Sequence, residues 1–200
     1  MNVFFFFLII VPSAIIHEYS HAWAANQLGD PTAKRAGRLT INPLAHIDPF
    51  GTVFLPLIFI LTGSQFLFAY AKPVPFNPYL LKSQKYGPGL VALAGPMSNL
   101  LVALFFGLLI RFLPLSSLTI FFSIIVSINI LLMVINLIPI PPLDGSRILF
   151  SLLPSSLMRY QFALERYGLF IVLFLFIFAS RPIFYFISYL TNLITGLSFF

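Results

Sequence analysis

The chain has 200 residues, of which 60% are hydrophobic and only 8% are charged. A soluble domain carries about 25% charged residues, so this composition indicates an integral membrane protein. Cysteine is absent, which excludes disulfides and thiolate metal sites and leaves histidine, aspartate and glutamate as metal ligands. The net charge of +6 is not gathered into a basic cluster with interleaved aromatic residues, so nucleic acid is not an expected partner.

Long apolar segments predict an all-α fold with about five transmembrane helices in a single membrane-embedded domain, residues 1–200. A span needs roughly 17–25 predominantly apolar residues. The first segment has no basic region before it, so a cleaved signal peptide is not expected. Arg181 and Pro182 interrupt the pattern near the C-terminus, and the residues after them either return across the membrane or lie along its surface. The five segments are residues 3–28, 89–112, 118–138, 162–179 and 183–200.

The apolar segment 52–61 is predicted to form a re-entrant hairpin rather than a span. It would cover about 15 Å as a helix, which is half of a hydrocarbon core of roughly 30 Å. It also contains Pro56 and is followed by Gly63. Before it, the stretch RLTIN at residues 38–42 alternates weakly between polar and apolar side chains. This stretch is expected to form either a short edge strand that receives an extended substrate or a surface hairpin.

The distribution of basic residues favours the hairpin. If segment 52–61 does not cross the membrane, nine lysine and arginine residues lie on one side and two on the other, whereas a crossing gives five and six. Basic residues concentrate in cytoplasmic loops, so the nine-to-two arrangement is expected. It places the N-terminus outside and His21 near the cytoplasmic end of its helix. The nine residues are Lys34, Arg35, Arg38, Lys72, Lys82, Lys85, Arg147, Arg159 and Arg166, and the two are Arg111 and Arg181.

The first apolar segment contains an HExxH motif made of His17, Glu18 and His21. A helix places the two histidines on one face, one turn apart, where two imidazoles can share a metal ion. Glu18 lies beside them, where a carboxylate can take a proton from an attacking water molecule. Ionisable groups inside a bilayer are costly and usually functional. The alternative is a pair of interfacial histidines with a glutamate that extends to the membrane surface.

The third predicted span ends in residues 136–145, NLIPIPPLDG. Its prolines cannot continue a helix and leave carbonyl groups without intrahelical donors, which is tolerated at membrane depth only beside protein or a polar cavity. Under the hairpin topology, Asp144 lies on the same side of the membrane as the two histidines. Two histidines and one carboxylate form a zinc site of the catalytic type. The alternative is an exposed aspartate that caps a helix.

Two amides and a third histidine are further candidates for the site. Gly95 and Pro96 open the second long span, and they allow close helix approach and loosen the helix near Asn99. Asn99 and Asn136 are therefore expected near the metal, where they either position a substrate backbone or hold the broken helices together. His46 either polarises the scissile carbonyl, forms a hydrogen bond within the hairpin or faces water, and the structural roles are favoured.

HEYSH, GPMSN and NLIPIPPLDG, in this order, resemble the three motifs of the site-2 protease family of intramembrane zinc metalloproteases. INPLAHIDPFGT and AKPVPFNP resemble loop segments of that family, and the resemblance covers about residues 13–151. It implies one zinc ion per chain, held by His17, His21 and Asp144, with Glu18 as the catalytic acid and base. Asn99 and Asn136 would be substrate-side or supporting residues. The chain resembles a small form of the family without a PDZ or CBS domain, in which helices over residues 160–200 follow the motif core.

The resemblance implies an endopeptidase that hydrolyses peptide bonds in or near the transmembrane segments of membrane proteins, as in regulated intramembrane proteolysis. A multi-pass location in a bacterial inner membrane is expected, with the active site toward the cytoplasm and the oligomeric state open. One rival is a protease whose third ligand is Glu165. Another is a metal-ion transporter or a non-catalytic zinc-binding protein. A transporter would carry polar residues through the full bilayer depth, whereas here they cluster on one side.

Overall fold

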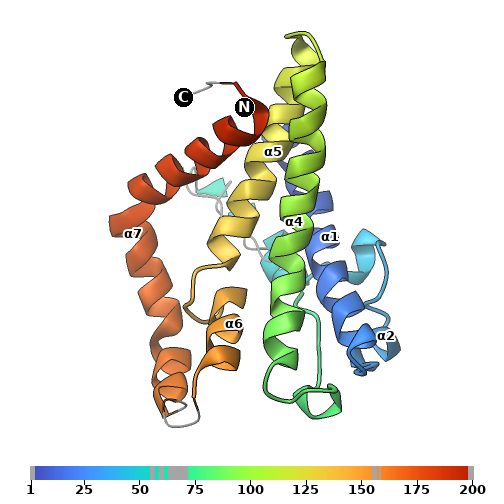
Figure 1. Ribbon diagram of the computed structural model, residues 1–200, viewed down its shortest axis with the longest axis vertical. Coiled ribbons are helices and arrows are strands. Elements are labelled where there is room, and N and C mark those ends of the chain that lie inside the picture. The colour runs from blue at the N-terminus through green and yellow to red at the C-terminus, as the bar shows by residue number, and fades with distance from the viewer. Residues whose placement is uncertain are drawn as a thin grey trace.

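The computed structural model describes residues 3–54, 57–58, 61–62, 72–154, 157 and 159–197, and this part of the chain is helical without any strand. Four long helices run up and down beside one another, and shorter ones lie in the connections (Figure 1). The long helices are α1 (Val3–Gln27), α4 (Gly87–Phe112), α5 (Ser117–Asn136) and α7 (Arg159–Thr195). The short elements are α2 (Thr32–Arg35), η1 (Pro43–Ala45), η2 (Pro49–Phe54), η3 (Pro78–Leu80) and α6 (Asp144–Leu152).

Three of the long helices are long and apolar enough to cross a membrane, namely α4, α5 and the Gln161–Thr195 part of α7. The first of these matches the span predicted over residues 89–112, and the second matches the span predicted over 118–138. Helix α1 follows the segment predicted over 3–28 and carries the HExxH motif in its second half. The chain is therefore a helical, membrane-associated protein, as its composition predicts.

The interruption predicted at Arg181 and Pro182 is not observed, because residues Arg159–Thr195 form one continuous helix. Helix α7 bends near its middle (Figure 1), and Pro182 lies inside it. Proline removes one backbone donor and clashes with the preceding turn, which bends a helix without necessarily ending it. A helix of this length would extend about 55 Å if straight, well beyond a hydrocarbon core of about 30 Å. The bend lets the second half of α7, its outer half, run obliquely across the bundle.

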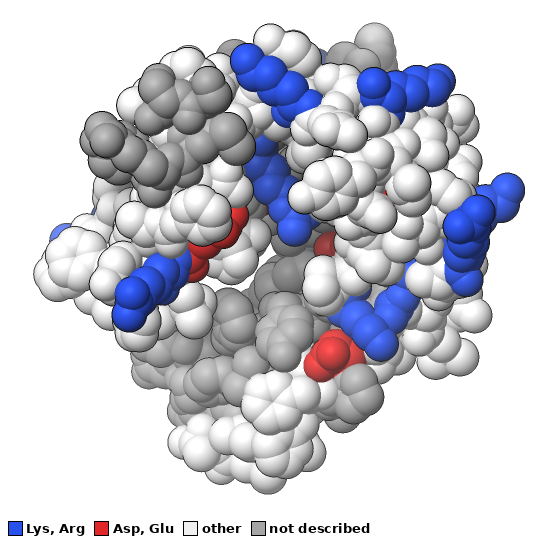
Figure 2. Space-filling view, turned by 90° about the horizontal axis from the view of Figure 1, so that it is seen from below, with Lys and Arg blue, Asp and Glu red and all other residues white. Residues whose placement is uncertain are grey.

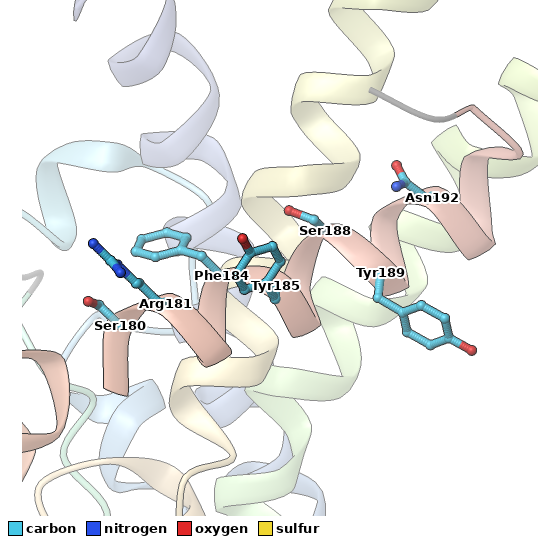
Figure 3. Close-up of a pocket in the computed structure, with 7 residues that line it drawn as sticks. All are labelled: Ser180, Arg181, Phe184, Tyr185, Ser188, Tyr189 and Asn192. Atoms are coloured by element: carbon cyan, nitrogen blue, oxygen red, sulfur yellow. The ribbon is translucent and has the colours of Figure 1, made fainter. Parts of the chain in front are cut away.

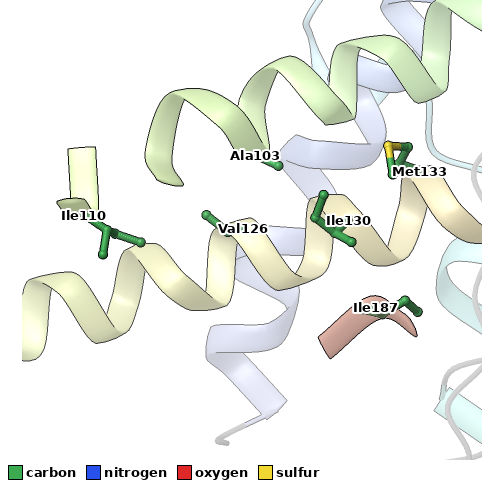
Figure 4. Packing of buried hydrophobic residues seen from close by; sticks show 6 residues of the cluster. All are labelled: Ala103, Ile110, Val126, Ile130, Met133 and Ile187. Carbon is green, nitrogen blue, oxygen red and sulfur yellow. The ribbon is translucent and has the colours of Figure 1, made fainter. Parts of the chain in front are cut away.

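Helix α4 occupies the centre of the fold and contacts α1, α5, α6 and α7. Its outer part packs against α5 and α7 through small and branched side chains (Figure 4). In lipid, such packing depends on close van der Waals contact rather than on exclusion of water. A side chain at Gly107 would collide with Ile194, so the glycine lets α7 close on α4. The cluster consists of Ala103, Ile110, Val126, Ile130, Met133 and Ile187.

The C-terminal end of α7 is fastened to α4 by Arg111. Its Nε donates a hydrogen bond to the Ile194 carbonyl at 3.0 Å, and its Nη2 donates to the Leu193 carbonyl at 2.6 Å. The last carbonyl groups of a helix have no intrahelical donors, so these two bonds supply partners that lipid could not. The outer half of α7 is thus held to α4 at its end.

The connection between α1 and α4 begins and ends at the same end of the bundle. The backbone N–H of Lys82 donates to the Leu28 carbonyl at 2.8 Å. The buried carboxylate of Asp30 accepts from the backbone and the hydroxyl of Thr32 and from the backbone N–H of Asn77. Burial opposes ionisation of Asp30, but these hydrogen bonds hold its pKa below the ordinary value. The hairpin predicted over residues 52–61 lies partly outside the described residues and stays a prediction.

The short β segment predicted beside the hairpin is absent, because residues 38–42 are irregular. Side chains occupy the backbone groups that a strand would need. The Arg38 guanidinium donates to the Ala45 carbonyl, and His46 Nε2 donates to the Thr40 carbonyl at 2.8 Å. Asn42 caps η1 by accepting from the backbone N–H of Leu44 at 3.1 Å. The loop is therefore folded onto itself instead of offering a free edge.

Candidate metal centre

Three potential metal ligands converge where α1 meets the start of α6. His17 and His21 face each other from successive turns of α1, with 3.0 Å between their Nε2 atoms. The Asp144 Oδ2 atom lies 3.1 Å from His17 Nε2 and 3.2 Å from His21 Nε2. Both histidines are buried and Asp144 is half-buried. Among the described residues, this is the group of histidine and carboxylate side chains that could hold a metal ion.

The spacing of these three atoms fits zinc. Zinc binds histidine nitrogen and carboxylate oxygen at about 2.0–2.2 Å in a tetrahedron, whose ligand atoms are then about 3.3 Å or slightly more apart. The observed separations of 3.0–3.2 Å are close to this value. Two histidines and one carboxylate also leave one position of a tetrahedron open, which is a property of catalytic rather than structural zinc sites.

The hydrogen bonds of the histidines leave both Nε2 atoms available to a cation. His17 Nδ1 donates to Asn99 Oδ1 at 2.6 Å, and His21 Nδ1 donates to the Val91 carbonyl at 2.7 Å. Because carbonyl oxygens only accept, both Nδ1 atoms carry the proton, and each neutral ring has its lone pair on Nε2. Both lone pairs point toward each other and toward the Asp144 carboxylate. Three lone pairs this close repel one another unless a cation lies between them.

A buried polar network behind His17 joins α1, α4 and α5. Asn99 Nδ2 donates to Asn129 Oδ1 at 2.9 Å and to the Ser13 carbonyl at 3.3 Å. Asn129 Nδ2 in turn donates to Ser13 Oγ at 3.0 Å. Both amides are fully buried. Donation to the Ser13 carbonyl fixes the orientation of the Asn99 amide, so its oxygen faces His17 and sets the tautomer of the ring.

Two glycines make room for the site. A Cβ atom at Gly95 would lie 2.5 Å from His21 Nε2 and 2.6 Å from His17 Nε2, inside the space that the ligands enclose. A Cβ atom at Gly145 would lie 2.5 Å from the Ile138 carbonyl oxygen. Gly95 therefore lets α4 pass directly over the histidines, and Gly145 lets α6 start tightly against the end of α5. The second contact brings Asp144 into reach of α1.

The proline-rich segment before Asp144 is covered on one side by α7. Pro141 is buried, and a side chain at Gly168 would collide with the Pro141 carbonyl. Part of the segment is also paired within itself, since the backbone N–H of Leu143 donates to the Ile140 carbonyl at 3.0 Å. The segment is thus less open than its prolines suggest, and it connects the inner half of α7 to the candidate ligand Asp144.

The other predicted site residues differ in whether they contact the three candidate ligands. Asn99 contacts His17 directly, as described above. Asn136 Nδ2 donates to the Leu132 carbonyl of its own helix at 2.9 Å and bonds to none of the three candidate ligands. His46 is buried in the loop after α2, and its Nδ1 has no partner among the described residues. Glu18 follows His17 in α1 and is half-buried.

Sequence reasoning missed Asn129, Ser13, Val91 and the packing role of Gly145. Asn129 carries the one signal that a sequence offers for such a residue, an amide in the middle of a long apolar helix. Ser13 precedes His17 by one helical turn and therefore lies on the same face. The Val91 carbonyl has no signature in the sequence, because any residue type supplies the same group.

Known proteins match the chain over most of its length. Residues 113–179 match the description of peptidase family M50. The Bacillus subtilis protein YwhC, which is named as a zinc metalloprotease, is 37% identical over 179 residues, covering 84% of this chain and 78% of YwhC. Rip2 of Mycolicibacterium smegmatis, also named as a zinc metalloprotease, is 32% identical over 168 residues, covering 82% of this chain and 63% of Rip2. No solved structure matches the chain.

These similarities and the helical fold define a membrane-associated zinc metallopeptidase. The chain belongs to peptidase family M50, the site-2 protease family. The resemblance carried by the three sequence motifs is thereby confirmed, as is zinc as the cofactor.

Proposed function

We propose that this enzyme hydrolyses peptide bonds in or near the transmembrane segments of membrane proteins, as in regulated intramembrane proteolysis. The observation that carries the proposal is the convergence of His17 Nε2, His21 Nε2 and Asp144 Oδ2 within 3.2 Å of one another in an apolar helical bundle. Membership of family M50 supports the same reaction class. A water-consuming active site enclosed by apolar helices acts on substrates that are themselves in the membrane.

In this proposal, His17, His21 and Asp144 hold one zinc ion. When bound, zinc supplies a Lewis acid that polarises the scissile carbonyl and lowers the pKa of water. The histidines offer Nε2 because Asn99 and Val91 occupy their Nδ1 atoms. Asp144 adds a negative charge to two neutral rings, which strengthens the binding of a dication at low dielectric.

We assign Glu18 the role of general base and then general acid. Its carboxylate takes the proton of the attacking water, and it later delivers a proton to the departing amine, so one residue serves both halves of the reaction. A transmembrane substrate hides its carbonyl groups in helical hydrogen bonds, and it must unwind locally before attack. Asn99 and Asn136 are assigned supporting roles, since the observed bonds of both run to protein groups.

The proposed orientation places the active site toward the cytoplasm of a bacterial cell, in its inner membrane. In this topology nine lysine and arginine residues lie on the cytoplasmic side and Arg111 lies on the other, with Arg181 inside α7, and this asymmetry supports the sidedness. The hydrogen bond between Lys82 and Leu28 supports it too, because it brings the two ends of the α1–α4 connection together. Figure 2 shows lysine and arginine side chains spread around this end of the molecule. We further propose that α1 crosses the membrane and that residues 52–61 re-enter it without crossing.

Cleavage of a single-span model substrate by the full chain in proteoliposomes tests the proposal. Wild type should cut the substrate, a zinc chelator should stop the cleavage, and added zinc should restore it. Glu18→Gln should bind zinc normally but lose activity by about 100- to 10,000-fold, the usual contribution of general acid–base catalysis.

The matched control is Glu165→Gln, because Glu165 is the other glutamate of the chain and, in the part of the chain that the structure describes, it pairs only with Gln161 at the exposed start of α7. This variant should cleave at the wild-type rate. Cleavage that survives thorough zinc removal, or a Glu18→Gln enzyme with full activity, would rule out the proposed reaction.

A further inference from the structure

The outer half of α7 carries an arginine that the fold does not use. Arg181 lies inside the apolar helical stretch Gln161–Thr195, is exposed, and makes no hydrogen bond or ion pair with the described residues. Arg111, in contrast, binds two carbonyls of α7, and Arg147 lies over the ring of Phe76 at 4.8 Å. A charged side chain within a membrane helix is costly, and it usually marks a functional site with a partner of opposite charge.

None of the Asp and Glu side chains of the described residues is such a partner. Its five carboxylates all precede Arg181 in the sequence, and none lies in the outer half of α7 or after it. No ion pair joins any of them to Arg181 among the described residues. Glu18 belongs to the HExxH motif, Asp144 contacts the two histidines, and Glu165 accepts from Gln161. The remaining two, Asp30 and Asp48, accept from backbone N–H groups of the α1–α4 connection.

Arg181 begins a polar face along α7. Arg181, Tyr185, Ser188 and Asn192 follow one another at intervals of four, three and four residues, which places them on one side of a helix. They line a hollow of about 620 Å³ together with Ser180, Phe184 and Tyr189 (Figure 3). The side-chain oxygen of Asn192 is buried and has no partner among the described residues. We call Arg181, Tyr185, Ser188 and Asn192 the α7 face.

The alternating spacing of the α7 face is that of a seam between two helices. Serine, asparagine and tyrosine at such seams form hydrogen bonds between membrane helices, where lipid offers no partners. The face therefore suits a second apolar helix better than it suits lipid chains. Arg181, at the inner end of the α7 face, favours a partner with a negative charge.

We propose that the α7 face docks the transmembrane segment of the substrate, and that it favours a segment with an aspartate or glutamate in its apolar stretch. This inference rests on the proposed function. The inner half of the same helix contacts Pro141, three residues before Asp144. A segment that docks on α7 thus lies along the helix that borders the candidate metal centre.

Two other occupants fit the α7 face less well. A second copy that packs through the same α7 face brings no side-chain carboxylate to Arg181, because no acidic residue lies in the outer half of its own α7. A lipid phosphate lies at the membrane surface, whereas Arg181 lies within the apolar stretch Gln161–Thr195 and is far from both ends of α7. A carboxylate on a spanning helix reaches this depth.

The test compares three model substrates that share one transmembrane sequence and carry glutamate, glutamine or lysine at a single position, scanned along the span. The wild-type enzyme should cleave the glutamate substrate about tenfold faster than the glutamine substrate at the best position, which corresponds to about 1.4 kcal/mol. For Arg181→Gln, the ratio of the two rates should fall to about one. Arg181→Glu should prefer the lysine substrate. The matched control, Arg166→Gln, changes an arginine that lies over Tyr167 near the start of α7, and it should keep the wild-type ratio.

Cross-linking identifies the occupant directly, because the chain has no cysteine of its own. Tyr185→Cys should form a disulfide with a cysteine placed in the substrate span. Disulfide-linked enzyme dimers without any enzyme–substrate product would assign the face to a second copy and overturn the proposal. Equal cleavage of the glutamate and glutamine substrates by wild type at every position would also overturn it, as would a preference that follows anionic lipid instead of substrate charge. In each of these results the enzyme still cleaves, so the proposed function is judged separately.

Discussion

The Asn99–Asn129–Ser13 network allows a prediction about zinc affinity that depends on a residue outside the metal centre. Replacing Asn129 by leucine keeps the approximate size of the side chain but removes its hydrogen bonds to Asn99 and Ser13. Asn99 is then left with the Ser13 carbonyl at 3.3 Å as the partner of its amino group. The Asn99 amide then keeps one long hydrogen bond in place of two, so the acceptor of the His17 Nδ1 proton is held less firmly.

The size of the effect follows from the bonds that are lost. Hydrogen bonds between membrane helices average about 0.6 kcal/mol, so loss of two of them should lower the free energy of unfolding by about 1.2 kcal/mol. Loss of a partner that orients a ligating histidine typically weakens metal binding by about 10- to 100-fold. This range corresponds to about 1.4–2.7 kcal/mol of binding free energy. Zinc affinity should therefore fall more clearly than stability.

The assay is competition for zinc between the purified enzyme in detergent and a chelator of known affinity, with thermal unfolding of the zinc-free protein measured beside it. Asn136→Leu is the matched control, because Asn136 lies on the same helix and, among the described residues, its side chain bonds only to the Leu132 carbonyl. We expect this variant to bind zinc as wild type does. Wild-type affinity in Asn129→Leu, or an equal loss in both variants, would show that the network does not orient His17.

Four further outcomes follow from the structure. Gly95→Ala should abolish zinc binding, because the added Cβ would lie 2.5–2.6 Å from both histidine Nε2 atoms, and elemental analysis measures this. Asp144→Ala should hold far less than one zinc per chain, and a full zinc content would remove Asp144 from the site. Single cysteines at Lys34 and Lys82 should react with an impermeant thiol reagent from the same side of the membrane, whereas labelling from opposite sides would refute the re-entrant topology. Because folding lowers the pKa of Asp30, its ionised form stabilises the protein above the unfolded pKa of about 3.9, and this stabilisation is lost as pH falls through the folded value. The difference in melting temperature between wild type and Asp30→Asn should therefore narrow from pH 7 toward pH 3.

The candidate ligands could be predicted from the sequence because the chain leaves little choice. It contains three histidines and five acidic residues, and the one pair of histidines at helical spacing flanks a glutamate. Asp144 required a second, independent step, since it lies more than 120 positions away in the sequence. The charge asymmetry supplied that step by placing the end of the third span on the same side as the HExxH motif.

The supporting residues could not be predicted in the same way, because their roles exist only between helices. Gly95 was expected to allow close helix approach, but which atoms it approaches depends on the rotation of α4 about its axis. The partner of His21 is the carbonyl of Val91, a backbone group that carries no sequence signal. Asn129 could be noticed as a polar residue in an apolar helix, yet its contact with Asn99 and Ser13 depends on how α1, α4 and α5 pack.

The interruption predicted at Arg181 and Pro182 does not occur in α7 for a different physical reason. Arg181 and Pro182 favour an interruption of the helix by local propensity, so the sequence predicts two separate segments there. The helix continues because contacts beyond the proline hold its outer half, namely Ile187 in the apolar cluster and the two carbonyls bound by Arg111. Tertiary packing thus outweighs a local preference that costs a few kcal/mol in an isolated helix.

Because α7 is continuous, the environment of Arg181 differs from the one that the sequence predicts. As a residue of a loop between two spans, Arg181 would lie in water and need no partner. Inside one long helix it lies in an apolar stretch, exposed and without an ion pair among the described residues. The polar groups of α1, α4 and α5 are satisfied by one another around the candidate metal centre, so they form a fixed scaffold. On the α7 face, the Arg181 guanidinium and the Asn192 side-chain oxygen have no partner among the described residues, and for that reason α7 is the helix on which recognition of another molecule is to be sought.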